Sequence, residues 1–245
     1  MADQPPGSSD TYALSGVLVA VGAAVLFTGT LFYIRLTQDL GLPSAPATYT
    51  QALADARALG PRPMFLAGVF AFFGDVFLTA GCIAMITRRR LRRSDLEGFG
   101  WTLVAIGAAV AMVFDSMMAV LLAPLAQLSD PGVFVAFKGW FDLLFASGNV
   151  PYGIGAVAVL VADMRSERPL LPQALAAFGV AVGVVAFASG AGYVAGIVVL
   201  PAAIGLTVTF GCVVFAVLGV QIARRESGRA LRTSPSLAAS AVAAG

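Results

Sequence analysis

Apolar residues fill six long stretches of the chain, and polar residues collect in the short segments between them. The stretches cover residues 12–36, 63–87, 98–125, 133–164, 171–190 and 197–223. A helix rises about 1.5 Å per residue, so each stretch can cross, or nearly cross, the roughly 30 Å hydrocarbon core of a bilayer. The pattern predicts an all-α, polytopic membrane protein with six transmembrane helices.

The composition supports this class of protein. Of the 245 residues, 59% are hydrophobic and 11% are charged, whereas about 25% of the residues in a soluble domain are charged. We therefore expect one membrane domain over residues 12–223, preceded by a short segment of residues 1–11, with the lipid bilayer as its partner. Basic residues stand at the ends of the apolar stretches, which argues against nucleic-acid binding. The chain has no histidine and two cysteines, so we expect neither a metal site nor a cofactor.

The distribution of basic residues predicts the orientation. Eleven of the 15 lie in residues 88–93, 165–168 and 224–232, which share one side of the membrane if the spans alternate. The other four fall on the opposite side: Arg35, Arg57, Arg62 and Lys138. Both termini are then cytoplasmic, and we expect the protein in the cytoplasmic (inner) membrane of a bacterium. Residues 224–245 are expected to form a disordered cytoplasmic tail.

Two shorter patterns predict helices at the membrane surfaces. Residues 47–60 have an amphipathic pattern that ends at Gly60, typical of a helix lying on the outer surface. Ser94 and Glu97 have the spacing of a capping box, which favours a helix start directly after the basic segment 88–93.

Short phrases recur along the chain. "VAVG" ends at Gly22 and Gly183, and "VAIG" ends at Gly107, in three odd-numbered spans. In the even-numbered spans a glycine follows six residues after Asp75, after Asp142 and after Gly205. These matches indicate three repeated two-helix hairpins, with the bundle axis and any site between the even-numbered spans. The alternative is chance similarity between helices rich in alanine, valine and glycine.

Ionisable residues inside the spans are candidate site residues, because each costs about 2.5–3.5 kcal/mol near the bilayer centre on insertion scales. Counted from the cytoplasmic arginines, Asp115 and Asp142 lie near the outer interface, and Lys138 lies one turn further out. With Arg35, these residues predict an outer vestibule in which Asp115 can pair with Arg35. The alternative is an ordinary interfacial belt in which Lys138 and Asp142 form only a structural ion pair.

Asp75 is expected near the middle of the membrane, at a height close to that of Asn149. Pro151 lacks an amide donor, so the fourth span should break there and leave the carbonyl of Ser147 free. Together with the hydroxyl of Tyr152, these groups predict a polar pocket for a proton, a cation or a small polar solute. In the alternative, Asp75 only hydrogen-bonds Asn149 or the freed carbonyl and holds the helices together.

Other chemistries are disfavoured by the same count of heights. The Gly-Asp pair at Gly74 is similar to a motif of intramembrane aspartyl proteases, but the heights of Asp75 and Asp115 differ by roughly 13 Å. Cys82 and Cys212 are also at unequal heights, which argues against a disulfide. The sequence therefore favours a small transporter or channel-like protein. A non-catalytic scaffold or accessory subunit is the alternative, and enzyme activity is not expected.

Overall fold

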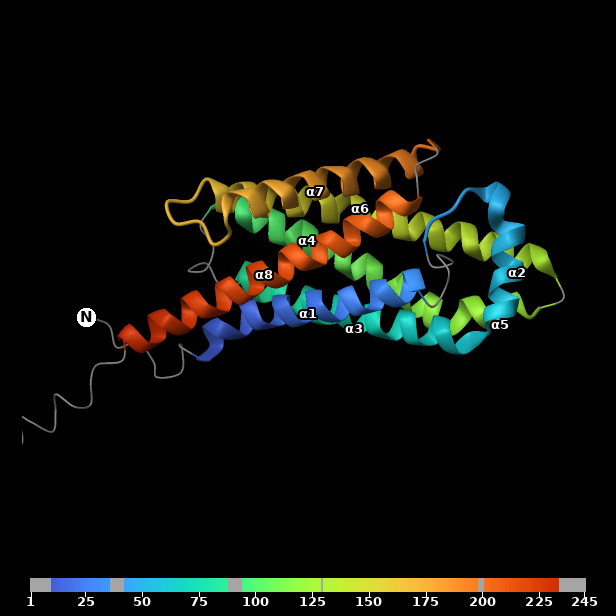
Figure 1. Cartoon of the computed structure of the whole chain (residues 1–245), viewed down its shortest axis with the longest axis horizontal. Helices are drawn as coiled ribbons and strands as arrows, with labels where there is room; N and C mark the ends of the chain where they lie inside the picture. The colour runs from blue at the N-terminus through green and yellow to red at the C-terminus, as the bar shows by residue number, and fades with distance from the viewer. Residues whose placement is uncertain (1–9, 36–41, 88–93, 129, 198–200, 234–245) are drawn as a thin grey trace, which may run out of the picture.

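The computed structural model describes residues 10–35, 42–87, 94–128, 130–197 and 201–233 (Figure 1). Within these ranges, six helices are long and apolar enough to cross a membrane, which confirms the six-span, all-α prediction. Large apolar side chains such as Phe73 and Val184 are each 50% exposed, as lipid-facing positions require. The chain is therefore a multi-pass membrane protein whose outer helix faces contact the bilayer.

Helices account for almost all of the described chain. The spans are α1 (Asp10–Arg35), α3 (Pro61–Thr87), α4 (Asp95–Met117) with its continuation, α6 (Pro131–Met164), α7 (Gln173–Val194) and α8 (Pro201–Thr233). A π-helical segment (Met118–Leu122) and α5 (Ala123–Ala126) continue α4 and complete the third span. Residues 224–233 belong to α8, where the sequence predicted the start of a disordered tail. The rest of that tail and the basic segment 88–93 lie outside the described residues.

The six spans form a closed ring in the order α1, α3, α4, α6, α7 and α8, and α8 packs back against α1. Because the order around the ring is the order along the chain, neighbouring helices run antiparallel. The start of α1 and the end of α8 lie at one end of the bundle, and α5 lies at the opposite end (Figure 1).

Helix α2 (Tyr49–Leu59) lies across that opposite end, after a single 3-10 turn (Pro46–Thr48). It occupies the segment that the sequence predicted to be amphipathic, and it packs on α5 and α6. Its buried residues share one face: Tyr49, Ala52, Leu53 and Ala56. Gly60 ends the helix in the left-handed region, with φ of 75°. Arg57 donates to the carbonyl oxygens of Ala126 (2.7 Å) and Leu128 (3.1 Å), which ties α2 to the end of the third span.

Glycine brings helix backbones into contact around the ring. A Cβ atom at Gly22 of α1 would lie 2.4 Å from the backbone nitrogen of Leu78 and 2.9 Å from the carbonyl oxygen of Gly74, both on α3. No side chain fits in that space without moving a backbone. The pairing of α1 with α3 therefore depends on this glycine, as is usual where helices associate in lipid.

The second hairpin has the same geometry. A Cβ atom at Gly107 of α4 would lie 3.0 Å from the backbone nitrogen of Tyr152 and 2.9 Å from the carbonyl oxygen of Gly148, both on α6. When the two contacts are matched, Asp75 of the first hairpin corresponds to Asn149 of the second. The two hairpins thus place a polar residue at the same point of their packing.

The third hairpin departs from this arrangement. The three atoms nearest to a Cβ atom at Gly183 of α7 all belong to α6, among them the carbonyl oxygen of Gly153 at 3.0 Å. Helix α8 makes its more extensive contact with α1 instead of with α7. The predicted threefold repeat is therefore realised only in the first two hairpins, and it matches Asp75 to Asn149 where the sequence had matched Asp75 to Asp142.

We expect Gly22→Ala to lower the free energy of unfolding by about 1–3 kcal/mol, because the added methyl group would overlap the backbone of α3. The control is Gly139→Ala on α6, where the new Cβ atom would lie 3.7 Å from the ring of Tyr49. That variant should be neutral or more stable, because alanine favours the helix by about 1 kcal/mol over glycine. Thermal unfolding in detergent compares the two, and equal unfolding temperatures would contradict the prediction.

Candidate functional site

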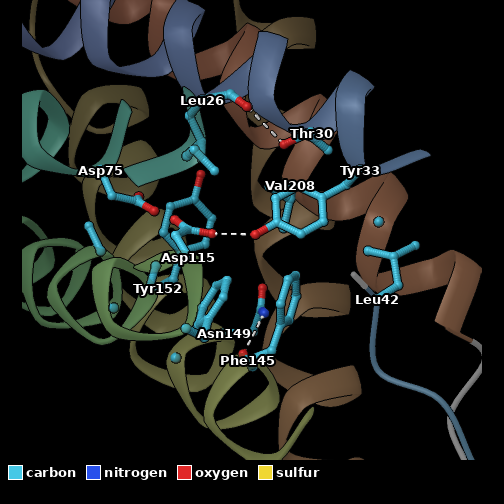
Figure 2. Close-up of a pocket in the computed structure, with 17 residues that line it drawn as sticks. Leu26, Thr30, Tyr33, Leu42, Asp75, Asp115, Phe145, Asn149, Tyr152 and Val208 are labelled. Carbon is cyan, nitrogen blue, oxygen red and sulfur yellow. Dashed lines mark hydrogen bonds between the residues drawn. The ribbon is translucent and has the colours of Figure 1, made fainter. Parts of the chain in front are cut away.

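A cavity of about 50 Å³ lies inside the ring. Its walls come from α1, α3, α4, α6 and α8, and Leu42 lines one side (Figure 2). Because one water needs about 10–15 Å³ of such space, the cavity can hold roughly three to five waters or one small solute. It is too small for a lipid tail or a peptide.

Two acidic side chains face each other in this cavity. Asp75 of α3 is 2% exposed and Asp115 of α4 is 1% exposed. Both line the same cavity, and their carboxyl groups point toward each other (Figure 2). The hydroxyl of Tyr33 on α1 donates a hydrogen bond of 2.7 Å to Oδ1 of Asp115. Three helices thus bring polar groups to one point.

This contact corrects the heights inferred from the sequence. Counting from the cytoplasmic arginines assumed that α3 and α4 leave the membrane surface at the same height. In the structure, the backbone of the third span at Asp115 and Ala119 packs against Gly68, which lies about two turns from Asp75 on α3. That register, with the reach of the two side chains, closes the expected gap of roughly 13 Å. The argument from height against a carboxyl pair was therefore wrong.

Four buried side-chain oxygens in the described part of the chain have no hydrogen-bond partner: Asp75 Oδ2, Asp115 Oδ2, Tyr152 Oη and Thr79 Oγ1. Three of them belong to residues that line the cavity, and Thr79 lies one turn from Asp75 on α3. An ionised carboxylate only accepts hydrogen bonds, so the two carboxyl groups cannot satisfy each other without a proton. Because buried polar atoms are nearly always paired, this cluster indicates a place for a proton, water or a solute.

Two of the three site residues predicted on α6 line the cavity, and the third does not. Asn149 and Tyr152 line it, as Asp75 does. The side-chain amide of Asn149 donates to the carbonyl oxygen of Phe145 on its own helix, at 2.9 Å, and not to Asp75. Ser147 does not line the cavity, and its hydroxyl donates to the carbonyl oxygen of Leu144 at 2.9 Å.

The predicted break in the fourth span was also wrong. Helix α6 continues through Pro151 without interruption. The irregular backbone lies in the third span, where the π-helical segment begins three residues after Asp115. Such segments are frequent at functional sites. The signal in the sequence was Pro124, which has no amide to donate to the carbonyl of Val120.

The four residues predicted to form an outer vestibule are not brought together. Arg35 is exposed at the end of α1, and Asp115 instead accepts its hydrogen bond from Tyr33 in the cavity. Lys138 and Asp142 form an ion pair, but both side chains are completely buried rather than lining an opening.

The buried ion pair anchors the segment of residues 42–44. Nζ of Lys138 donates to the carbonyl oxygen of Leu42 at 3.0 Å. Oδ2 of Asp142 accepts from the backbone nitrogen of Ser44, also at 3.0 Å. The side chain of Leu42 is held against the cavity, where a Cβ atom at Gly205 of α8 would lie 3.0 Å from it. The ion pair thus fixes the segment that places Leu42 at the wall of the cavity.

Two tyrosines complete this anchor. The hydroxyls of Tyr49 on α2 and Tyr193 on α7 lie 3.3 Å apart, and Tyr193 donates to the carbonyl oxygen of Ser44 at 3.2 Å. Burial raises the pKa of the Tyr49 hydroxyl, and the hydrogen bond with Tyr193 raises that pKa further. Tyr49 therefore stays protonated at neutral pH and can donate to Tyr193.

Tyr33 is the main site residue that the sequence did not single out. With its neighbours on "LFYIR" it is typical of an interfacial aromatic belt. The spacing of Leu26, Thr30 and Tyr33 could have identified it, because these residues share the face of α1 that lines the cavity.

Comparison of the chain with protein-family models, curated proteins and solved structures finds no match. The chemistry of the cavity therefore rests on its own geometry. That geometry defines a membrane protein with a central cavity that two buried acidic side chains line.

We expect Lys138→Met to cost about 3–5 kcal/mol of stability, because it leaves the carboxylate of Asp142 buried without its cation. The double variant Lys138→Met with Asp142→Leu should recover part of this loss, since neither charge is then buried. Arg62→Met is the control, because Arg62 is exposed. Thermal unfolding in detergent measures all three, and a harmless Lys138→Met would show that the ion pair does not hold the segment.

Proposed function

We propose that this protein moves a small solute across the membrane through the central cavity, with Asp75 and Asp115 taking up and releasing a proton in each cycle. The observation that carries the proposal is the facing carboxyl pair, whose Oδ2 atoms have no partner. Neither lysine nor arginine is among the residues of the described chain that line the cavity.

Electrostatics favours a shared proton at this pair. Two ionised carboxylates side by side in a low-dielectric site repel each other, and burial disfavours each charge. One proton between them removes the repulsion and gives both unpaired oxygens a partner. The other titratable groups near Asp75 are phenols and thiols, which are ordinarily neutral at pH 7: Tyr33 from α1, Tyr152 from α6, Cys82 from α3 and Cys212 from α8.

A purely structural role explains the cavity less well. Polar residues that hold membrane helices together do so through hydrogen bonds between the helices. Here Asn149 bonds within its own helix, and Tyr152 and Asp75 keep oxygens unpaired. Hydrolysis by the acidic pair is also disfavoured, because a cavity for a few waters cannot admit a peptide bond with its flanking residues.

Purified protein in liposomes on a solid-supported membrane tests the proposal. A pH jump should produce a charge displacement in the wild type, and Asp75→Asn and Asp115→Asn should reduce it to the level of protein-free liposomes. Both variants should unfold at an unchanged or higher temperature, because they remove a destabilising functional group. Asp130→Asn is the control, since Asp130 only caps α6 and asparagine caps equally well. Wild-type protein without a displacement, or variants that retain it, would sink the proposal.

We also propose that both termini are cytoplasmic and that α2 lies on the outer side. The distribution of basic residues along the sequence supports this orientation, because 11 of the 15 lie in residues 88–93, 165–168 and 224–232, on the side of the termini if the spans alternate.

Cysteine labelling in intact cells checks the orientation. In a background of Cys82→Ala and Cys212→Ala, we expect an impermeant thiol reagent to label Ala47→Cys and to spare Glu167→Cys, because both positions are exposed but lie at opposite ends. Permeabilised cells should show labelling of both. Labelling of Glu167→Cys alone in intact cells would reverse the orientation.

A further inference from the structure

We infer that the solute is a compact organic cation of the ammonium or guanidinium type, bound between the acidic pair and the aromatic side chains of the cavity. The transport of this cation rests on the proposed function, but its binding can be measured separately.

The charge of the cavity selects a cation. Among the described residues that line the cavity, Asp75 and Asp115 are the carboxylic acids, and none is basic. A single positive charge beside one carboxylate neutralises that group as well as the shared proton does. A neutral solute would leave the acidic pair as it is, and an anion would be repelled by any ionised carboxylate.

Aromatic rings select an organic cation. Four of them line the cavity: Tyr33, Phe114, Phe145 and Tyr152. The rings of Phe114 and Phe145 pack with centroids 4.5 Å apart, which makes a continuous aromatic wall. Ammonium and guanidinium groups bind favourably to such rings, particularly where water is excluded.

A bare metal ion fits the same walls poorly. Sodium-like and calcium-like hard cations prefer about six or more oxygen ligands. The unpaired oxygens at the cavity are those of Asp75, Asp115 and Tyr152. In the described chain, no three groups from histidine, cysteine, aspartate and glutamate are arranged to hold a metal ion.

The size of the cavity limits the cation. A volume of about 50 Å³ suits methylammonium or guanidinium, since it corresponds to only a few waters. Binding then exchanges one charge for another: the cation enters beside the carboxylates, and the proton they shared leaves to the solvent. The net charge of the acidic pair is the same before and after the exchange, because one cation replaces one proton.

Isothermal titration of the full-length protein in detergent, in two buffers of different ionisation enthalpy, tests this exchange. Methylammonium and guanidinium should bind and release about one proton per cation bound. Urea, the neutral counterpart of guanidinium, and sodium or potassium ions should bind at least about tenfold more weakly. Asp75→Asn should abolish proton release.

Phe145→Leu should weaken cation binding about 2- to 30-fold, because it removes a ring from the wall. The matched control is Phe178→Leu on α7, a ring that is 45% exposed on the outer surface; it should bind like the wild type. If Phe145→Leu does not fold, Phe114→Leu replaces it.

Urea binding as tightly as guanidinium, a preference for sodium ions, or unchanged binding by folded Phe145→Leu would each overturn the inference. Cation binding with proton release, but without a charge displacement in liposomes when the pH jump is applied in the absence of the cation, would refute only the transport function. A charge displacement on a pH jump without cation binding would refute only the assignment of the solute.

Discussion

Backbone contact at glycine is the constraint on which the rest of this structure depends. Lipid gives two apolar helices no hydrophobic reason to associate, so close packing has to supply the attraction. Gly22 and Gly107 let α1 meet α3 and α4 meet α6 at backbone distance. The same small side chains that draw neighbours together also leave the centre of the ring empty. Ala71, Ala108 and Gly148 line the cavity but cannot fill it.

The two acidic sites of this protein show how differently a membrane protein can treat a buried charge. Asp142 has a cation in Lys138 and a backbone donor in Ser44, so its carboxylate is fully paired and serves the structure. Asp75 and Asp115 share the cavity with each other, and no basic side chain is among its described lining residues. An ionised group costs about 2.5–3.5 kcal/mol near the bilayer centre on insertion scales, and acidic residues retained there usually mark a functional site. The contrast within one chain is the reason for assigning function to the unpaired acids and packing to the paired one.

Hydropathy and periodicity are local signals, and they predict the spans and the helix at residues 49–59. They also predict three of the residues that line the cavity: Asp75, Asn149 and Tyr152. The partnership of Asp75 with Asp115 is not local. It depends on the register between α3 and α4, which the contact of Gly68 with the α4 backbone decides. Rise per residue gives height only along a single helix, and it carries no information about how two helices slide past each other.

The effect of proline was likewise set by context. Pro151 lies inside a helix that continues on both sides, whereas Pro124 follows a π-helical segment. Each proline lacks a backbone amide hydrogen. The packing of neighbouring helices decides whether the α-helix continues without that hydrogen bond or changes to a π-helix. A single-sequence argument can therefore locate the missing hydrogen bond but not the resulting irregularity.

The match between the first two hairpins explains why the cavity has one charged centre and not two. Equal packing of Gly22 and Gly107 makes Asp75 equivalent to Asn149, and Thr30, eight residues after Gly22, equivalent to Asp115. Each hairpin supplies one acid and one neutral polar group, but at exchanged positions. Asp75 and Asp115 consequently meet across the boundary between the hairpins. The amide of Asn149 and the hydroxyl of Thr30 occupy the two positions equivalent to these acids. If the two hairpins were fully symmetric, the two residues at each pair of equivalent positions would both be acidic or both be neutral. The exchange of positions concentrates one negative centre in the cavity, which suits a single monovalent cation.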